Sequence, residues 1–327
     1  MKNSTLHLLL PHGLYITTDD SRDTPVLDNW YKRGDSLQVP PLELGKLLFQ
    51  LLGIDIETQD VPVAAFENLA LTERSDGAWF IKARPINLVP DRAHLVINDG
   101  SDNSIAGDQE KILISGLNEF FKDNGLQFIH IARSNWHIRS NTHYCLRTSP
   151  FIEAITKKIV VSLFEGDDAR LWINWNNEMQ MWLHSSVAKS HQNASADYNS
   201  LWLWGSGVLP SFVPDSPWDL IVSDNLFVRG VARWLDVPVC SGEEFFDSPE
   251  SYADKQTRIL CVPGPDIGTV MARFVDSEWI TPINDLLMQG RIKEVVCDLP
   301  NGIRIAADRS SRWRFWRSGK GVSPLNA

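Results

Sequence analysis

The chain has 327 residues, of which 43% are hydrophobic and 22% are charged. Its 31 Lys and Arg against 41 Asp and Glu give a formal net charge of -10, which argues against non-specific binding to nucleic acid or to anionic membranes. This length favours more than one structural unit, because single hydrophobic cores stop growing at roughly 250 to 300 residues.

The first apolar run, Leu6 to Leu10, contains His7 and is ended by Pro11, so it predicts a buried strand and not a signal-peptide core. No stretch approaches the roughly 18 consecutive apolar residues of a membrane span. The four cysteines are scattered without a Cys-x-x-Cys pair, as is typical of a reducing compartment. We therefore expect a cytoplasmic protein with no membrane partner.

The region 76–199 predicts a self-contained α+β unit. Strands are expected at AWFIKA and HLVIND, followed by a helix over Asp108–Asn124 that is closed by Gly125. A meander of three strands then leads to helices over Pro150–Leu163 and Asp168–Ser185.

Beyond residue 200 the pattern changes to alternating strands and helices. DLIVS precedes a helix over Asp224–Leu235 with Ser223 as its expected N-cap, and VPVC follows. RILCVPG, a helix over Ser277–Gln289 and EVVCDL form a second such series, and Asn-Gly then predicts a hairpin into IRIAA. The continuous apolar strands indicate a parallel sheet that is covered on both faces.

These patterns predict an α/β fold class. Residues 1–75 and 200–327 are expected to form an α/β core with a mostly parallel sheet built from both ends of the chain. The α+β unit of residues 76–199 would interrupt that core.

The stretch NSLWLWGSGVLP contains a possible ligand-binding turn at Gly205-Ser206-Gly207. Phosphate-binding glycine loops open a helix, but here Pro210 and Pro214 follow instead. The tryptophans of this strand alternate with leucines, as burial on both faces requires. The residue pattern alone therefore favours a buried strand that ends in a tight turn.

The segment 309–320 gathers Arg and Lys side chains around Trp313, Phe315 and Trp316. This combination can stack on rings and pair with phosphates, so we expect a protein or another anionic partner there. An exposed basic terminus without a partner is the alternative.

Metal ligands are sparse in the second half of the chain, where no histidine follows His191. This excludes a His-ligated metal site from that half. Asp266, Asp298 and Asp308 remain possible oxygen ligands at strand ends, although an Asp after Pro can equally be a helix cap.

The segment NNEMQMWLHSSVAKSHQNASADYNSLWLWGSGVLPSF, followed by DNLFVRGVARWLDVPV, resembles the RpfE-type regulatory proteins of bacteria, which are often labelled phosphoglycerate mutase. That group is similar, more distantly, to the archaeal-type cofactor-independent phosphoglycerate mutases. The resemblance to the RpfE-type group covers most of the chain, whereas the resemblance to the mutases is specific from Asn199 to Gly230.

Upstream, DGAWFIKARPINLVPDRAHLVIND resembles a mutase stretch that contributes to substrate binding. The resemblance implies ligand-binding roles for the following residues: Arg84, Asn87, Arg92, Arg133, Asn199, Gly205 and Gly207.

The resemblance also implies a core like that of the alkaline phosphatase superfamily, with an inserted substrate domain. Mutases of this class use a metal-held serine and two metal ions bound by Asp and His. Here the starting motif occurs only as LLLPHG, the later His ligands have no counterpart, and Trp204 replaces an arginine. We therefore expect a non-catalytic regulatory or ligand-binding pseudoenzyme without a cofactor, since a metal clamp on the phosphoryl group would be missing.

Two alternatives remain open. The first is a metal-dependent phosphoglycerate mutase or phosphohydrolase that holds Mg²⁺ or Mn²⁺ through Asp266 and Asp308. The second is an interaction module that acts through the 309–320 segment. For the non-catalytic hypothesis, the expected ligand is a small phosphorylated metabolite held by Arg84, Arg92 and Arg133.

Overall fold

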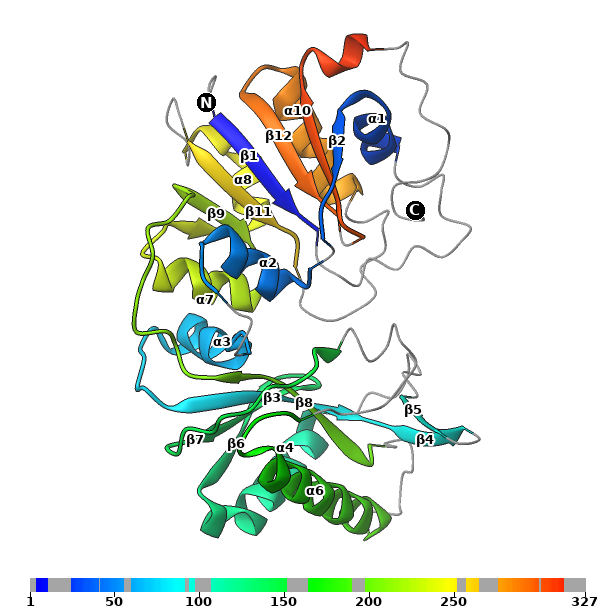
Figure 1. Ribbon diagram of the computed structural model, residues 1–327, viewed down its shortest axis with the longest axis vertical. Helices are drawn as coiled ribbons and strands as arrows, with labels where there is room; N and C mark the ends of the chain where they lie inside the picture. Colours follow the sequence, from blue (N-terminus) through cyan, green and yellow to red (C-terminus); the bar gives the residue numbers. More distant parts are fainter. Residues whose placement is uncertain are drawn as a thin grey trace. The chain divides into compact units, whose positions relative to one another are not determined.

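The computed structural model describes residues 4–10, 25–40, 42–55, 60–91, 94–97, 107–151, 164–189, 198–251, 257–264, 276–299 and 301–314. The chain divides into two compact units. Unit 1 comprises residues 1–55, 69–73 and 212–327, and unit 2 comprises residues 56–68 and 74–211. Each unit has its own sheet and its own core (Figure 1).

Unit 1 contains a seven-stranded sheet in the order β10-β9-β11-β1-β12-β13-β2. Its strands are β1 (Ser4–Leu9), β2 (Asp35–Gln38), β9 (Leu220–Ser223), β10 (Val239–Cys240), β11 (Arg258–Val262), β12 (Ile292–Asp298) and β13 (Ile303–Asp308). Every neighbouring pair from β10 to β12 is parallel, and β13 alone runs against its neighbours. The predicted α/β class, with a mostly parallel sheet built from both ends of the chain, is confirmed.

The helices of unit 1 connect and cover these strands. They are α1 (Pro25–Arg33), α2 (Leu44–Leu51), α7 (Leu226–Trp234), α8 (Gly242–Asp247) and α10 (Thr281–Met288), with the short turns η3 (Pro249–Ser251), η4 (Asp276–Ile280) and η5 (Ser311–Trp313). The helix predicted behind Ser223 is present as α7, but its N-cap is Asn225, whose side chain accepts a hydrogen bond from the Val228 N–H.

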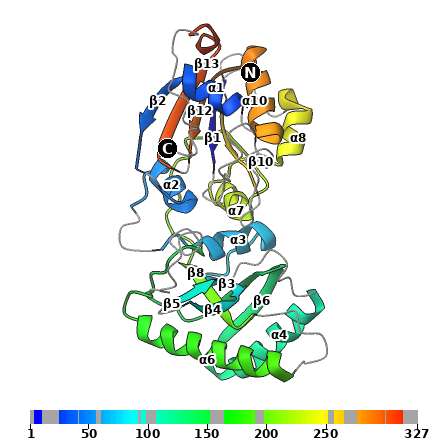
Figure 2. The same cartoon turned by 90° about the vertical axis from the view of Figure 1, so that its right-hand side faces the viewer.

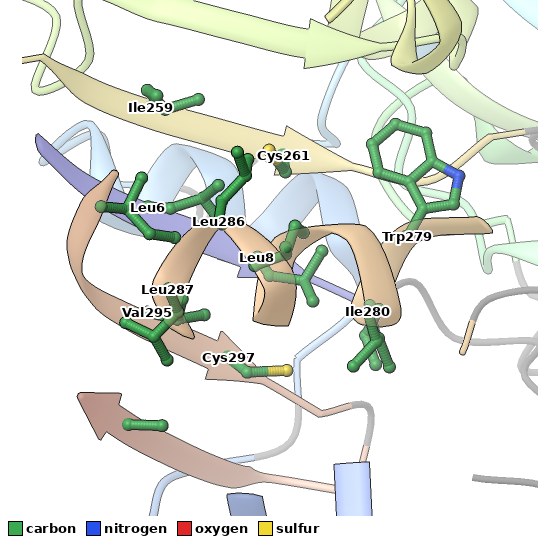
Figure 3. Packing of buried hydrophobic residues seen from close by; sticks show 14 of the residues in the cluster. Leu6, Leu8, Ile259, Cys261, Trp279, Ile280, Leu286, Leu287, Val295 and Cys297 are labelled. Atoms are coloured by element: carbon green, nitrogen blue, oxygen red, sulfur yellow. The ribbon is translucent and has the colours of Figure 1, made fainter. Parts of the chain in front are cut away.

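The core of unit 1 lies between one face of the sheet and helices α1, α8 and α10. Leu6 and Leu8 from β1 pack beside Cys261 and Cys297 from the flanking strands, and Leu287 of α10 lies over them (Figure 3). Three of the four cysteines are buried here, and burial raises the pKa of the Cys240 thiol to about 12. These cysteines therefore act as small apolar core residues.

Unit 2 contains a four-stranded antiparallel sheet in the order β6-β7-β3-β8. Its elements are β3 (Trp79–Ile86), β4 (Leu88–Asp91), β5 (His94–Ile97), α4 (Gly107–Phe120), η2 (Lys122–Asn124), β6 (Leu126–Ala132), β7 (Asn135–Ser140), α6 (Ala169–Lys189) and β8 (Ser200–Gly207). Helix α3 (Val63–Thr72) begins in unit 2, and its last residues are assigned to unit 1.

The sheet of unit 2 is covered on both faces. Helices α4 and α6 bury one face around Trp136, Trp172 and Leu201 (Figure 2). The start of α3 packs on the other face through Ala64 and Ala65, against Phe80.

Strand β8 belongs to unit 2, because it pairs antiparallel with β3. The core had been expected to resume at residue 200, whereas the chain returns to unit 1 at residue 212. The predicted helix over 168–185 is present as α6, and most of the helix expected over 150–163 lies outside the described residues. None of the helices in the described part of the chain is long and apolar enough to cross a membrane.

Candidate functional site

The carboxyl ends of parallel strands form the edge where open α/β sheets bind ligands. In unit 1 this edge begins with Ser223, the last residue of β9, whose hydroxyl donates to the Val262 carbonyl at 2.8 Å and accepts from the Asn225 N–H at 3.0 Å. Gly264 follows β11, and a Cβ atom there would lie 3.0 Å from the Asn225 nitrogen. These contacts fasten the ends of two neighbouring strands together.

Asp224 lies in this same strand-end turn and is exposed. One carboxylate oxygen accepts a hydrogen bond from the Gly242 N–H at 3.3 Å. The sequence reasoning treated Asp224 only as part of a helix and missed it as a candidate. The signal was the run Ser-Asp-Asn directly after a buried apolar strand.

Asp298, the last residue of β12, lies at the same edge and forms a three-residue ion cluster. Arg304 binds it through both guanidinium branches, with Nε 2.6 Å from Oδ1 and Nη2 2.8 Å from Oδ2. His7 Nε2 lies 2.7 Å from Oδ2. Burial of the carboxyl group opposes its ionisation, but the hydrogen bonds from His7 and Arg304 outweigh burial and lower the pKa of Asp298.

Asp308, the other described candidate for a metal ligand, lies at the opposite end of the sheet. Strand β13 is antiparallel to β12, so Asp308 pairs with Glu294, whereas Arg304 pairs with Asp298. The Asp308 carboxylate accepts hydrogen bonds from the hydroxyls of Ser310 and Ser311, each at 2.8 Å at its shortest. These hydrogen bonds help to lower its pKa against the opposing effect of burial.

Asp266 lies outside the described residues. In the part of the chain that the structure describes, no three His, Cys, Asp or Glu side chains come together in a way that could hold a metal ion.

In unit 2 the structure brings together two of the predicted ligand residues, Asn87 and Asn199. The Asn199 amide donates to the Asn87 side chain at 3.2 Å and to the Leu88 carbonyl at 2.8 Å. It also accepts from the Leu88 N–H at 2.8 Å. Asn199 therefore imitates a strand partner for Leu88, and this structural role occupies both ends of its amide.

Arg84 extends from β3 on the face that also carries Trp202 and Trp204. Its guanidinium carbon lies 4.5 Å from the centre of the Phe151 ring, and Phe151 stacks on Trp204 at 6.0 Å. The ring contact orients a half-buried guanidinium, which is a geometry suited to binding anions.

Arg133 is exposed in the turn between β6 and β7. Because Ala83 pairs with Trp136, the end of β3 that carries Arg84 and the turn that carries Arg133 lie at the same end of the sheet. Arg92, the third predicted arginine, is outside the described residues.

Gly205 and Gly207, the glycines of the possible ligand-binding turn, pack against the residues that begin α3. A Cβ at Gly205 would lie 2.9 Å from the Val63 Cβ, and one at Gly207 would lie 3.0 Å from the Pro62 Cβ. The φ angles of Gly205 and Gly207 are 65° and 142°, in the region that favours glycine. The glycines therefore permit a close approach of two protein segments, as the buried-turn interpretation requires.

A half-buried carboxylate, Asp60, fixes this turn. Its oxygens accept from the Thr148 N–H at 2.9 Å and from the Ser206 hydroxyl at 3.2 Å, and the Thr148 hydroxyl also donates to it. The Gly205 N–H donates to the Thr148 hydroxyl at 3.0 Å. Desolvation raises the pKa of Asp60, although these hydrogen bonds partly oppose the shift.

A second buried cluster joins Glu67 of α3, Lys82 of β3 and His137 of β7. Glu67 accepts a hydrogen bond from the Lys82 ammonium through one oxygen, and His137 Nε2 lies 2.7 Å from the other. All three residues are at most 1% exposed, and the Lys82 ammonium lies 5.1 Å from the centre of the Trp204 ring. The sequence reasoning missed this cluster, and its only signal was a lysine inside the apolar strand AWFIKA.

Comparisons with known proteins place the fold but not the activity. No family model matches the chain. A search of curated proteins also found no match. Among solved structures, the PH0037 protein from Pyrococcus horikoshii superposes with a TM-score of 0.51 at 11% sequence identity, over 94% of this chain and 88% of its own.

The cofactor-independent phosphoglycerate mutase from Thermoplasma acidophilum DSM 1728 superposes with a TM-score of 0.42 at 14% identity, over 94% of this chain and 90% of its own. The likeness to PH0037 shows a shared fold. The TM-score of the second likeness is too low to carry an argument.

Proposed function

We propose that the chain is a non-catalytic, ligand-binding or regulatory relative of the cofactor-independent phosphoglycerate mutases, with a fold of the alkaline phosphatase type. The sequence resemblance from Asn199 to Gly230 supports this relation. An α/β core that is interrupted by an α+β unit also agrees with what the resemblance implies.

The observation that carries the non-catalytic part is the ion cluster at Asp298. A carboxylate at the carboxyl end of a central parallel strand is well placed to bind a metal ion or a substrate. Here Arg304 already neutralises it through two hydrogen bonds, and His7 contacts one of the same oxygens. A metal ion would have to displace a bidentate guanidinium from a carboxylate that is 2% exposed.

The proposed ligand is a small phosphorylated or carboxylated metabolite, bound by Arg84 and Arg133 of unit 2. Arginine matches phosphate and carboxylate oxygens with paired donors, and the Phe151 ring holds the Arg84 guanidinium in place. In this proposal Asn87, Asn199, Gly205 and Gly207 shape the surrounding backbone, consistent with their contacts.

The test combines metal analysis, turnover and binding on the full chain. We expect no stoichiometric metal by elemental analysis, and no phosphatase or 3-phosphoglycerate mutase turnover in added Mn²⁺. Calorimetry should detect saturable binding of 3-phosphoglycerate. The Arg84→Gln variant should weaken that binding by about tenfold or more, because it removes a charged donor.

Arg170→Gln is the matched control, since Arg170 is an exposed arginine on α6. It should bind as the wild type does, and the thermal midpoints of both variants would establish that they are folded. Stoichiometric metal with turnover would overturn the proposal and favour the metal-dependent mutase or phosphohydrolase. Absence of binding, or equal weakening by both variants, would contradict the assigned ligand site.

A further inference from the structure

A basic aromatic surface lies on unit 1 around η5, which packs against α1 and β13 (Figures 1 and 2). We call it the η5 platform. Its members are Arg312, Trp313 and Arg314 together with Lys32 and Arg33 at the end of α1.

The centre of the η5 platform is an exposed indole. Trp313 is 61% exposed, and the Arg312 guanidinium carbon lies 4.7 Å from the centre of its ring. The guanidinium covers one face of the indole, and the rest of the ring remains largely accessible to solvent. An exposed tryptophan of this kind costs solubility and contributes little to a core.

The backbone beneath the indole is fixed by several contacts. Arg33 at the end of α1 donates to the Arg312 carbonyl at 2.9 Å. Arg314 pairs with Asp35 at 2.9 Å. The hydrogen bonds of Ser311 to Asp308, at 2.8 Å from the hydroxyl and 2.9 Å from the N–H, hold the start of the turn. The platform is therefore ordered before any ligand arrives.

The charge of the η5 platform is opposite to that of the whole chain, which is -10. Asp35 and Asp308 lie beside it, but the first is paired with Arg314 and the second with serines. Arg312 is exposed, as is Lys32 in the last turn of α1. Glu294 lies opposite Asp308 on β12, so the platform and its edge carry four cations and three carboxylates, which favours an anionic ligand.

We propose that the η5 platform binds single-stranded nucleic acid, with a base stacked on Trp313 and phosphates paired with the surrounding arginines. A flat indole next to arginine side chains is the combination that binds unpaired bases without sequence preference. The three-residue turn η5 is neither the α-helix nor the two-stranded ribbon that the major groove of a duplex admits, which favours an unpaired strand as the ligand. An acidic peptide would use the cations but would gain little from the indole.

The test is fluorescence anisotropy of labelled oligothymidylate and oligouridylate with the full-length protein at low salt. We expect saturable binding that weakens as salt rises, because each phosphate that the protein neutralises on a single strand contributes about -0.7 to the slope of log K against log salt. Trp313→Ala should weaken binding about tenfold through lost stacking. Arg312→Gln should also weaken it and reduce the salt slope by about 0.7.

Two control variants change residues that are not members of the platform. Phe212→Ala removes another exposed aromatic ring, 72% exposed, and Arg170→Gln removes an exposed positive charge in unit 2. Both should bind as the wild type does. Because Arg312 and Trp313 are exposed, their variants should keep the wild-type thermal midpoint.

Four results would overturn the proposal. The first is no binding at low salt. The second is equal weakening by a platform variant and its control. The third is displacement of the oligonucleotide by polyglutamate at equal charge, together with wild-type affinity in Trp313→Ala, which would assign the surface to an acidic peptide. A duplex that binds more tightly than the single strand would likewise contradict stacking on Trp313.

Discussion

The substitution Glu67→Leu removes the carboxylate shared by Lys82 and His137. Both partners are buried, since Lys82 is 1% and His137 is 0% exposed. The Trp204 ring, whose centre lies 5.1 Å from the Lys82 ammonium, offsets only part of the lost attraction, because a desolvated cation–π contact is worth about 2 kcal/mol. The variant therefore leaves a buried positive charge without a counter-ion between α3 and the sheet of unit 2.

Breaking a buried ion pair by removing one partner costs about 3–5 kcal/mol. The reciprocal change, Lys82→Met, removes the ammonium that pairs with Glu67. Glu67 is 0% exposed, so this change should cost a similar amount. A domain has a total stability of roughly 5–15 kcal/mol, so each single variant should lose a large fraction of it. The double variant Glu67→Leu/Lys82→Met removes both charges and should recover most of the loss, since replacing a buried pair by apolar residues is often neutral or stabilising. A deficit of about 1–3 kcal/mol should remain, because His137 loses its hydrogen bond to Glu67.

The assay is urea unfolding of the wild type, both single variants and the double variant, followed by tryptophan fluorescence and circular dichroism. The expected coupling energy between Glu67 and Lys82 is at least about 3 kcal/mol. Single variants that each cost less than about 1 kcal/mol and add simply in the double variant would refute the reasoning. They would mean that the two side chains do not share a desolvated ion pair.

Three further outcomes are expected. Gly205→Ala should cost about 1–3 kcal/mol of stability and should cost more than Gly53→Ala. Both glycines have a positive φ, but only Gly205 lacks space for a Cβ. Equal losses by urea unfolding would argue against tight packing at Gly205. Asn199→Ala should cost about 1–3 kcal/mol by removing the hydrogen bonds to the half-buried Leu88 backbone, and calorimetry should show a smaller loss of 3-phosphoglycerate affinity than Arg84→Gln gives. The pKa of Asp298 is lowered in the folded protein, so the stabilisation that Arg304 gives it should be fully present above the ordinary carboxyl pKa of 3.8 and be lost as the pH falls below that value. The free energies of unfolding of Arg304→Gln and the wild type, measured in urea, should therefore converge in acid. A difference that stays constant with pH would contradict this prediction.

The sequence predicted those features that depend on neighbouring residues. The helix that became α6 followed from apolar residues at helical spacing, and the parallel strands followed from continuous apolar runs. Burial of β8 on both faces followed from alternating Trp and Leu, and Trp202 and Leu203 are both at most 2% exposed. In these cases the periodicity alone contains the information.

Features that depend on distant pairings were not accessible in the same way. Strand β8 was placed with the core because nothing in NSLWLWGSG specifies β3 as its partner. The contact between Glu67 and His137 joins residues 70 positions apart, so no local spacing reports it. The N-cap of α7 moved from Ser223 to Asn225 because the serine hydroxyl is engaged with the next strand.

A catalytic group has to exchange partners during a reaction, and that requirement separates the polar residues of this chain into two kinds. Asp298 and Asn199 have donors or acceptors that are satisfied by other parts of the same unit, so a substrate would have to break those contacts first. Asp224 and Arg133 are exposed, so a ligand can reach them. In the proposed function, the engaged carboxylate of Asp298 and the exposed guanidinium of Arg133 favour holding an anion over moving a phosphoryl group between oxygens.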